Sequence, residues 1–71
     1  MLLTEYRFDV AGLSCDHCRA AVEHEVGSLS GVTRVDVDLQ KNTVTVAGTM
    51  STEQVVKAIE EAGYEVVGEA G

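Results

Sequence analysis

Apolar residues follow two different spacings along this chain of 71 residues, and the order of those spacings restricts the fold more than any other feature. A period of two, typical of a half-buried strand, runs through residues 6–10, 35–39 and 43–46, and residues 64–67 form a short fourth predicted strand. A helical spacing runs through residues 16–28 and 51–62. The predicted order is therefore strand, helix, strand, strand, helix, strand.

Turn and capping residues separate these segments. Gly31 follows the first predicted helix and is a natural stop for it. Residues 40–42 form a short turn in which Asn42 can adopt a left-handed backbone, so the flanking strands must pair as an antiparallel hairpin. Ser51 and Gln54 have the spacing of a capping box at the start of the second helix.

The order of the elements predicts an α+β fold. Each helix has only one apolar stripe, and a sheet with one apolar face can cover both stripes. We therefore expect a ferredoxin-like βαββαβ sandwich, with a four-stranded antiparallel sheet and two helices on one face. The length supports a single domain over residues 1–71. A core this small argues against an enzyme with separate substrate and cofactor clefts.

The charge balance excludes some classes of partner. Five basic and twelve acidic residues give a net charge of −7, and the basic residues are scattered. Nucleic acid and anionic membrane surfaces both require clustered Lys and Arg, so neither is an expected partner. No apolar run approaches the length of about 20 residues that a membrane span needs. We expect no membrane insertion and, since no signal peptide is recognisable, a cytoplasmic location.

Two cysteines carry the most specific chemical signal in the chain. Cys15 lies on the predicted loop after the first strand, and Cys18 lies in the first turn of the helix that follows. This spacing brings both sulfurs to one side of the turn, within reach of one ion. Free N–H groups and the positive end of the helix favour the thiolate there. Soft thiolates select Cu(I), which accepts two ligands, whereas structural Zn²⁺ prefers four.

The cysteine spacing alone leaves other interpretations open, although metal binding is favoured. A zinc finger would need paired histidines downstream, and no histidine follows His24. A thioredoxin-like redox pair belongs to a larger fold with a proline beside the disulfide, and this chain has no proline. Two inert core cysteines are the third possibility. His17 lies between the thiols but is predicted to face outward, and Met50 is predicted to be a packing residue.

The segment Gly-Leu-Ser-Cys-Asp-His-Cys at residues 12–18 resembles the metal loop of the heavy-metal-associated domain, whose motif is Gly-Met-x-Cys-x-x-Cys. The resemblance covers essentially the whole chain, including residues 31–32 and 62–64. It implies that Cys15 and Cys18 bind Cu(I). Free-standing members of the family are copper chaperones. The same domain occurs in copper- and zinc-transporting P-type ATPases and in periplasmic mercury-binding proteins.

The resemblance also implies roles for four neighbouring residues. His17 lies just before the second cysteine. A histidine at this position resembles the bacterial chaperones of the CopZ type. Tyr64 falls where bacterial members place a tyrosine near the metal loop. Leu13 replaces the usual methionine, which packs under the loop and is not a ligand. Ser14 stands where zinc-transporting relatives usually have an acidic residue, and this favours copper.

The function implied by the resemblance is binding and transfer, not catalysis. A cytosolic copper chaperone would hold Cu(I) in the Cys-x-x-Cys loop and pass it, by thiolate exchange, to the metal-binding domain of a copper-transporting P-type ATPase. A copper-bridged homodimer is a further expected state. The alternatives are an N-terminal domain cut from a metal-transporting ATPase, and a mercury-binding or thiol redox protein.

Overall fold

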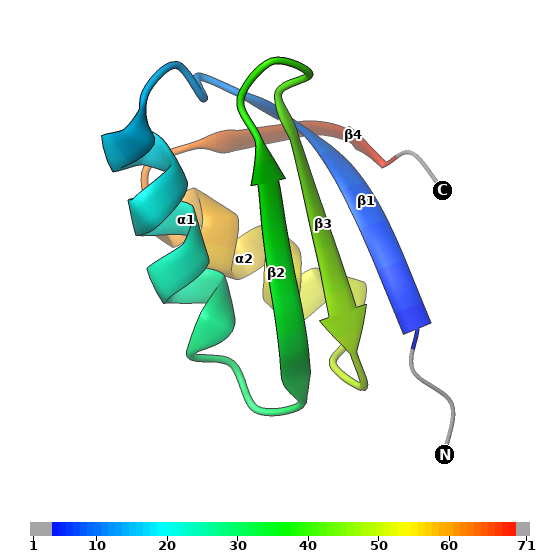
Figure 1. Ribbon diagram of the computed structural model, residues 1–71. Coiled ribbons are helices and arrows are strands. Elements are labelled where there is room, and N and C mark those ends of the chain that lie inside the picture. Colours follow the sequence, from blue (N-terminus) through cyan, green and yellow to red (C-terminus); the bar gives the residue numbers. More distant parts are fainter. Residues whose placement is uncertain (1–3, 70–71) are drawn as a thin grey trace.

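The computed structural model describes residues 4–69 and contains the six predicted elements in the predicted order (Figure 1). In chain order, they are β1 (Thr4–Ala11), α1 (Asp16–Gly27), β2 (Val32–Asp38), β3 (Thr43–Gly48), α2 (Thr52–Glu61) and β4 (Glu65–Glu69). No helix within this range is long and apolar enough to cross a bilayer.

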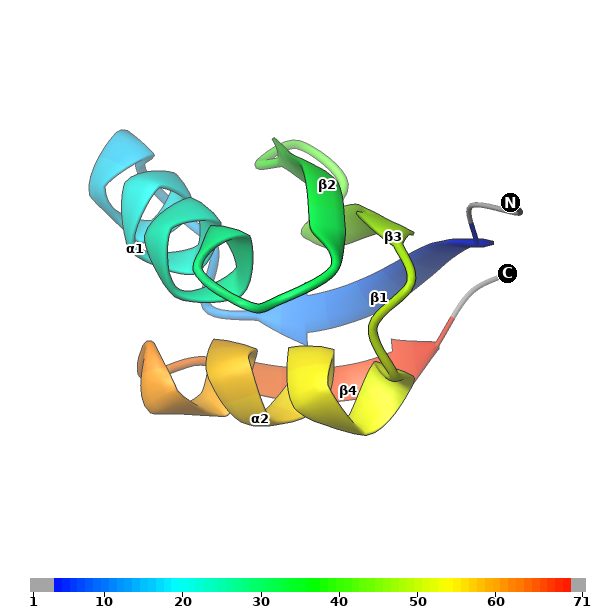
Figure 2. The ribbon, with the colours of Figure 1, turned by 90° about the horizontal axis from the view of Figure 1, so that it is seen from below.

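The four strands form one antiparallel sheet in the order β2-β3-β1-β4. β1 and β2 are parallel but do not touch, because β3 lies between them, and this is the split βαβ arrangement. Both helices lie on the same side of the sheet (Figure 2). The predicted fold class, a ferredoxin-like sandwich, is confirmed.

Local sequence signals account for the turns and for the start of α2. The Ser51 side chain accepts a hydrogen bond from the Gln54 backbone N–H, while the Gln54 side chain accepts one from the Ser51 N–H. The predicted capping box is therefore present. Asn42, in the β2–β3 turn, has a φ of 56°, which is the predicted left-handed backbone. A hydrogen bond of 2.8 Å from the Val10 N–H to the Asn42 carbonyl also joins this turn to β1.

The core lies between the sheet and the two helices. Residues of β1, β2 and β3 and one stripe from each helix are buried there, together with one residue from each of two connecting segments. The core residues are Phe8, Val10, Leu13, Val22, Val26, Val37, Val44, Val46, Met50, Val55, Ala58 and Ile59. Met50 is thus the packing residue that its position predicted.

Three connections meet at one end of the sandwich. They are the β1–α1 loop and the β2–β3 turn, both at the top of Figure 1, and the α2–β4 connection, at its upper left. Both cysteines are located at this end.

Candidate metal centre

Two residues fix the start of the β1–α1 loop, one through its backbone conformation and the other through a buried side chain. Gly12 has a φ of +93°, a backbone conformation that residues with a side chain rarely adopt. The next side chain, Leu13, is only 3% exposed and belongs to the core. The Leu13 side chain therefore anchors the loop in the position expected for the packing residue of the motif.

Cys15 and Cys18 occupy the boundary between this loop and α1. Cys15 is the N-cap of the helix, with an extended backbone, and its side chain makes no capping hydrogen bond. Its carbonyl accepts the first helical hydrogen bond, from the Arg19 N–H, so the helix begins immediately after Cys15. Cys18 lies within the first turn. Its side chain is half-buried and packs against the core, whereas Cys15 is exposed.

The two sulfurs are close neighbours. The Cys15 Sγ lies 3.3 Å from the Cys18 Sγ, and both cysteines are free thiols. This distance fits a hydrogen bond between a thiol and a thiolate, in which either sulfur can be the donor. Both sulfurs can contact a single ion placed outside the loop.

The surroundings of Cys18 favour its thiolate. The pKa of Cys18 is lowered to about 6 from an ordinary value of 9.0. The largest cause is hydrogen bonding from the main chain of Ser14, followed by the side chains of Tyr64 and Cys15. Partial burial opposes this shift but does not outweigh it. The Cys18 sulfur is therefore mostly ionised at neutral pH and ready to bind a metal.

Tyr64 reaches the site from the α2–β4 connection. Its ring is half-buried and lies against the backbone of Gly12, where a Cβ would come within 3.3 Å of the Tyr64 Cδ1. Hydrogen bonding to Cys18 raises the pKa of the Tyr64 hydroxyl, as expected for a donor that stabilises a neighbouring anion. The structure thus brings Tyr64 to the cysteine pair, from a distant part of the chain.

The remaining polar residues of the loop lie at the surface. His17 and Ser14 are exposed, and His17 faces outward as predicted. Asp16 forms an ion pair with Arg19 at 3.3 Å, and both side chains are well exposed. Within residues 4–69, no group of three or more His, Cys, Asp or Glu side chains is arranged to hold a metal ion. In the described part of the chain, therefore, no His, Asp or Glu side chain completes a set of three such groups with the two cysteines.

Comparison with known proteins identifies the family to which this geometry belongs. Residues 7–65 match the family described as "Heavy-metal-associated domain". The chain belongs to the heavy-metal-associated domain family. A protein of Staphylococcus haemolyticus named "Copper chaperone CopZ" is 51% identical over 61 residues, which cover 82% of this chain and 90% of that protein.

Solved structures of heavy-metal-associated domains have the same architecture. One described as "CopZ metallochaperone" superposes with a TM-score of 0.88 at 37% identity, over 90% of this chain and all of that one. A copper-binding domain of a P-type ATPase superposes with a TM-score of 0.84 at 26% identity, over 94% of this chain and 97% of that one. The family predicted from the Cys-x-x-Cys loop is therefore confirmed.

Proposed function

We propose that this protein is a cytoplasmic copper chaperone that holds Cu(I) between Cys15 and Cys18. The observation that carries the proposal is the pair of free sulfurs 3.3 Å apart at the start of α1. Support comes from a relative named as a copper chaperone and 51% identical over most of both chains. The activity is binding and transfer of the ion, without catalysis.

The number and kind of ligands favour Cu(I) over Zn²⁺. Thiolates are soft ligands, and soft ligands select Cu(I) among the common cellular metals. Structural Zn²⁺ prefers four protein ligands in a tetrahedron. Residues 4–69 supply only the two cysteines at this place. The exposed Ser14 adds no carboxylate to the set, and we assign no ligand role to His17.

Binding of Cu(I) requires a small movement of one sulfur. If the zinc–thiolate bond length of about 2.3 Å is taken as a guide, two sulfurs on opposite sides of one ion would be about 4.6 Å apart. The observed separation of 3.3 Å is shorter, so the sulfurs must open by roughly 1 Å on binding. Cys15 is exposed and free of capping bonds, whereas Cys18 is packed against the core. We therefore assign the movement to Cys15.

Transfer follows from the low coordination number. A two-coordinate ion has room for a third thiolate, and a partner with its own Cys-x-x-Cys loop can supply one. The incoming thiolate forms one copper–sulfur bond and Cys15 leaves, and the partner's second thiolate then displaces Cys18, so that the ion passes across without being released. The fitting partner is the metal-binding domain of a copper-transporting P-type ATPase, a kind of domain with the same fold as this chain. The same chemistry allows two copies of the chain to share copper in a bridged homodimer.

The test is a competition for Cu(I) under anaerobic conditions. The protein, the Cys15→Ser/Cys18→Ser variant and a Ser14→Ala control are each titrated against a chromophoric Cu(I) chelator. We expect the double variant to lose the tight site. Ser14→Ala should retain it, because the contact from Ser14 to Cys18 is made by the main chain. Undiminished affinity in the double variant would refute the proposal.

A second measurement separates the chaperone from the alternative functions. The copper-loaded protein is mixed with a copper ATPase domain, and the copper content of each is measured after separation, in the presence of the chelator. Transfer without loss to the chelator supports direct exchange. Tighter binding of Hg²⁺ than of Cu(I), together with no transfer of copper, would favour a mercury-binding protein. A stable disulfide in protein taken from the cytosol would favour a thiol redox protein.

A further inference from the structure

The outer edge of β2 lacks a neighbour within the described residues. β2 is the first strand in the sheet order β2-β3-β1-β4, so one of its two edges is open. Apart from the pairing with β3, no hydrogen bond in residues 4–69 uses a main-chain group of residues 34–38. An open edge of this kind is a template for a further strand.

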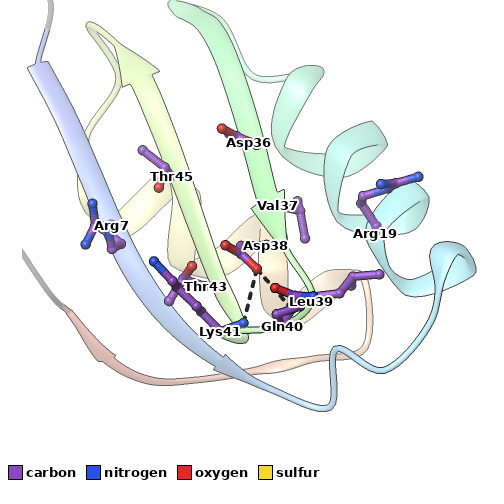
Figure 3. Close-up of a pocket in the computed structure, with 10 residues that line it drawn as sticks. All are labelled: Arg7, Arg19, Asp36, Val37, Asp38, Leu39, Gln40, Lys41, Thr43 and Thr45. Atoms are coloured by element: carbon purple, nitrogen blue, oxygen red, sulfur yellow. Dashed lines mark hydrogen bonds between the residues drawn. The ribbon is translucent and has the colours of Figure 1, made fainter.

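A cavity of about 370 Å³ lies beside the β2–β3 turn and extends over the outer face of the sheet, from β2 across β3 to Arg7 of β1 (Figure 3). Residues 36–41, from β2 and the β2–β3 turn, line it, and the side chains of residues 36–39 point alternately to the two faces of the sheet. Arg19 of α1 borders it on the helix side, and Thr45 of β3 borders it on the outer face. The end of this cavity between Arg19 and residues 37–39 adjoins the open side of β2.

Charges on β2 identify the added strand. Arg34 and Asp36 both lie on the outer face, are 70% and 63% exposed, and form a long ion pair of 3.7 Å within the chain. If a second copy of β2 pairs antiparallel about a two-fold axis at Val35, Arg34 of each copy lies directly opposite Asp36 of the other. Opposite charges in directly facing positions stabilise a pair of strands.

Other registers of the same pairing are less favourable. A shift of two residues in one direction places Asp36 opposite Asp36 on the axis, and a shift in the other direction places Arg34 opposite Arg34. A shift of one residue places the half-buried Val35 opposite Asp36, so that one copy is turned over. Only the register centred on Val35 joins two apolar side chains at the axis and matches both charge pairs.

We propose that the open edge of β2 is a self-association surface through which two copies of this chain join their sheets. The bulge near Thr33, where the register with β3 shifts, limits the new pairing to the residues around Val35, so the dimer is weak. Because the paired strands are antiparallel, the two Cys-x-x-Cys loops lie at opposite ends of the extended sheet. This dimer is therefore different from one bridged by copper, in which the loops must meet.

The test uses the metal-free Cys15→Ser/Cys18→Ser variant, so that shared copper and disulfides between loops cannot contribute. Sedimentation equilibrium gives the dissociation constant at concentrations up to the millimolar range. We expect Arg34→Asp and Asp36→Arg, each added alone, to weaken the dimer by about tenfold or more. The double change Arg34→Asp/Asp36→Arg should restore it, because it returns opposite charges to facing positions. Glu60→Arg, an exposed change on α2, is the charge-matched control and should have no effect.

A crosslink tests the register directly. In the same background, Val35→Cys places a thiol next to its own symmetry mate, and mild oxidation by oxidised glutathione should link the two copies. Val56→Cys, at a half-buried position on α2, should crosslink far more slowly. A monomer throughout the concentration range would overturn the proposal. So would a dimer that ignores the charges at Arg34 and Asp36, or one that the double reversal fails to restore.

Discussion

The ring of Tyr64 lies against the backbone of Gly12, so close that a Cβ on Gly12 would come within 3.3 Å of the Tyr64 Cδ1. Tyr64 also lowers the pKa of Cys18 through its side chain. The glycine of the metal loop therefore has two roles. It supplies a φ of +93°, and it leaves the space in which Tyr64 reaches the sulfur.

Gly12→Ala tests this relationship. The positive φ alone should cost about 1–2 kcal/mol of stability, and displacement of Tyr64 should raise the pKa of Cys18. Urea denaturation of the metal-free protein measures the first effect. The control is Gly27→Ala in α1, where a Cβ meets nothing within 4 Å. That change should stabilise the protein by about 0.5–1 kcal/mol. Equal effects at the two glycines would contradict the role given to Gly12.

Tyr64→Phe removes the hydroxyl and keeps the ring. The pKa of Cys18 should rise above about 6 and stay below 9.0, because the main chain of Ser14 still stabilises the thiolate. The measurement is the alkylation rate of Cys18 against pH, followed by mass spectrometry of its peptide. Tyr6→Phe, near the other end of β1, is the control and should leave the titration unchanged. An unchanged Cys18 titration in Tyr64→Phe would show that the hydroxyl has no part in it.

The stability of the metal-free protein should depend on pH through Cys18. Its pKa is about 6 in the folded protein and near 9.0 when unperturbed, so between these values the unfolded chain binds more protons. The free energy of unfolding therefore rises with pH from about 6 to 9, and this gain is lost as the pH falls through 6. Urea midpoints under reducing conditions measure the slope. Cys18→Ser should flatten it, and an equal slope in that variant would assign the effect to another group.

Leu13 should be important for stability rather than for binding. It is 3% exposed and part of the core, so Leu13→Ala should cost about 2–5 kcal/mol. Leu13→Met, which introduces the residue usual in the family, should cost less than about 1.5 kcal/mol. Denaturation of both variants gives the costs, and chelator competition gives the Cu(I) affinity. A large change of affinity in Leu13→Met, with stability preserved, would show that this position acts on the metal.

The spacing of apolar residues was sufficient to predict the type and order of the helices and strands. It predicted the first and last residues of these elements less accurately. β1 begins at Thr4 and β4 continues to Glu69, both beyond the predicted strands, because strand pairing extends where side chains give no apolar signal. β4 also carries a register shift opposite Asp9, which alternation of side chains cannot reveal. Local chemistry predicted the capping box at Ser51 correctly, since its partners lie within one turn.

The candidate site was predictable to different degrees. The loop position of Cys15 and the helical position of Cys18 followed from their spacing after the first strand, and the structure confirms both positions. The approach of Tyr64 followed only from the family resemblance. It depends on the long-range pairing of β1 with β4, which places Ala11 opposite Glu65. Nothing local to Tyr64 indicates that its hydroxyl lowers the pKa of a cysteine in another part of the chain.

Only one of the two sulfurs belongs to a residue of α1, and this affects how fast the pair can rearrange. Cys18 is carried by the first turn of α1, while Cys15 precedes it with an extended backbone and an exposed side chain. In the transfer proposed above, the first change in the coordination of the ion needs only a side-chain rotation at one residue, and exposed side chains rotate within nanoseconds or faster. In that proposed transfer, the first exchange of ligands needs no movement of the helix or the sheet, so the fold stays unchanged while the ion departs.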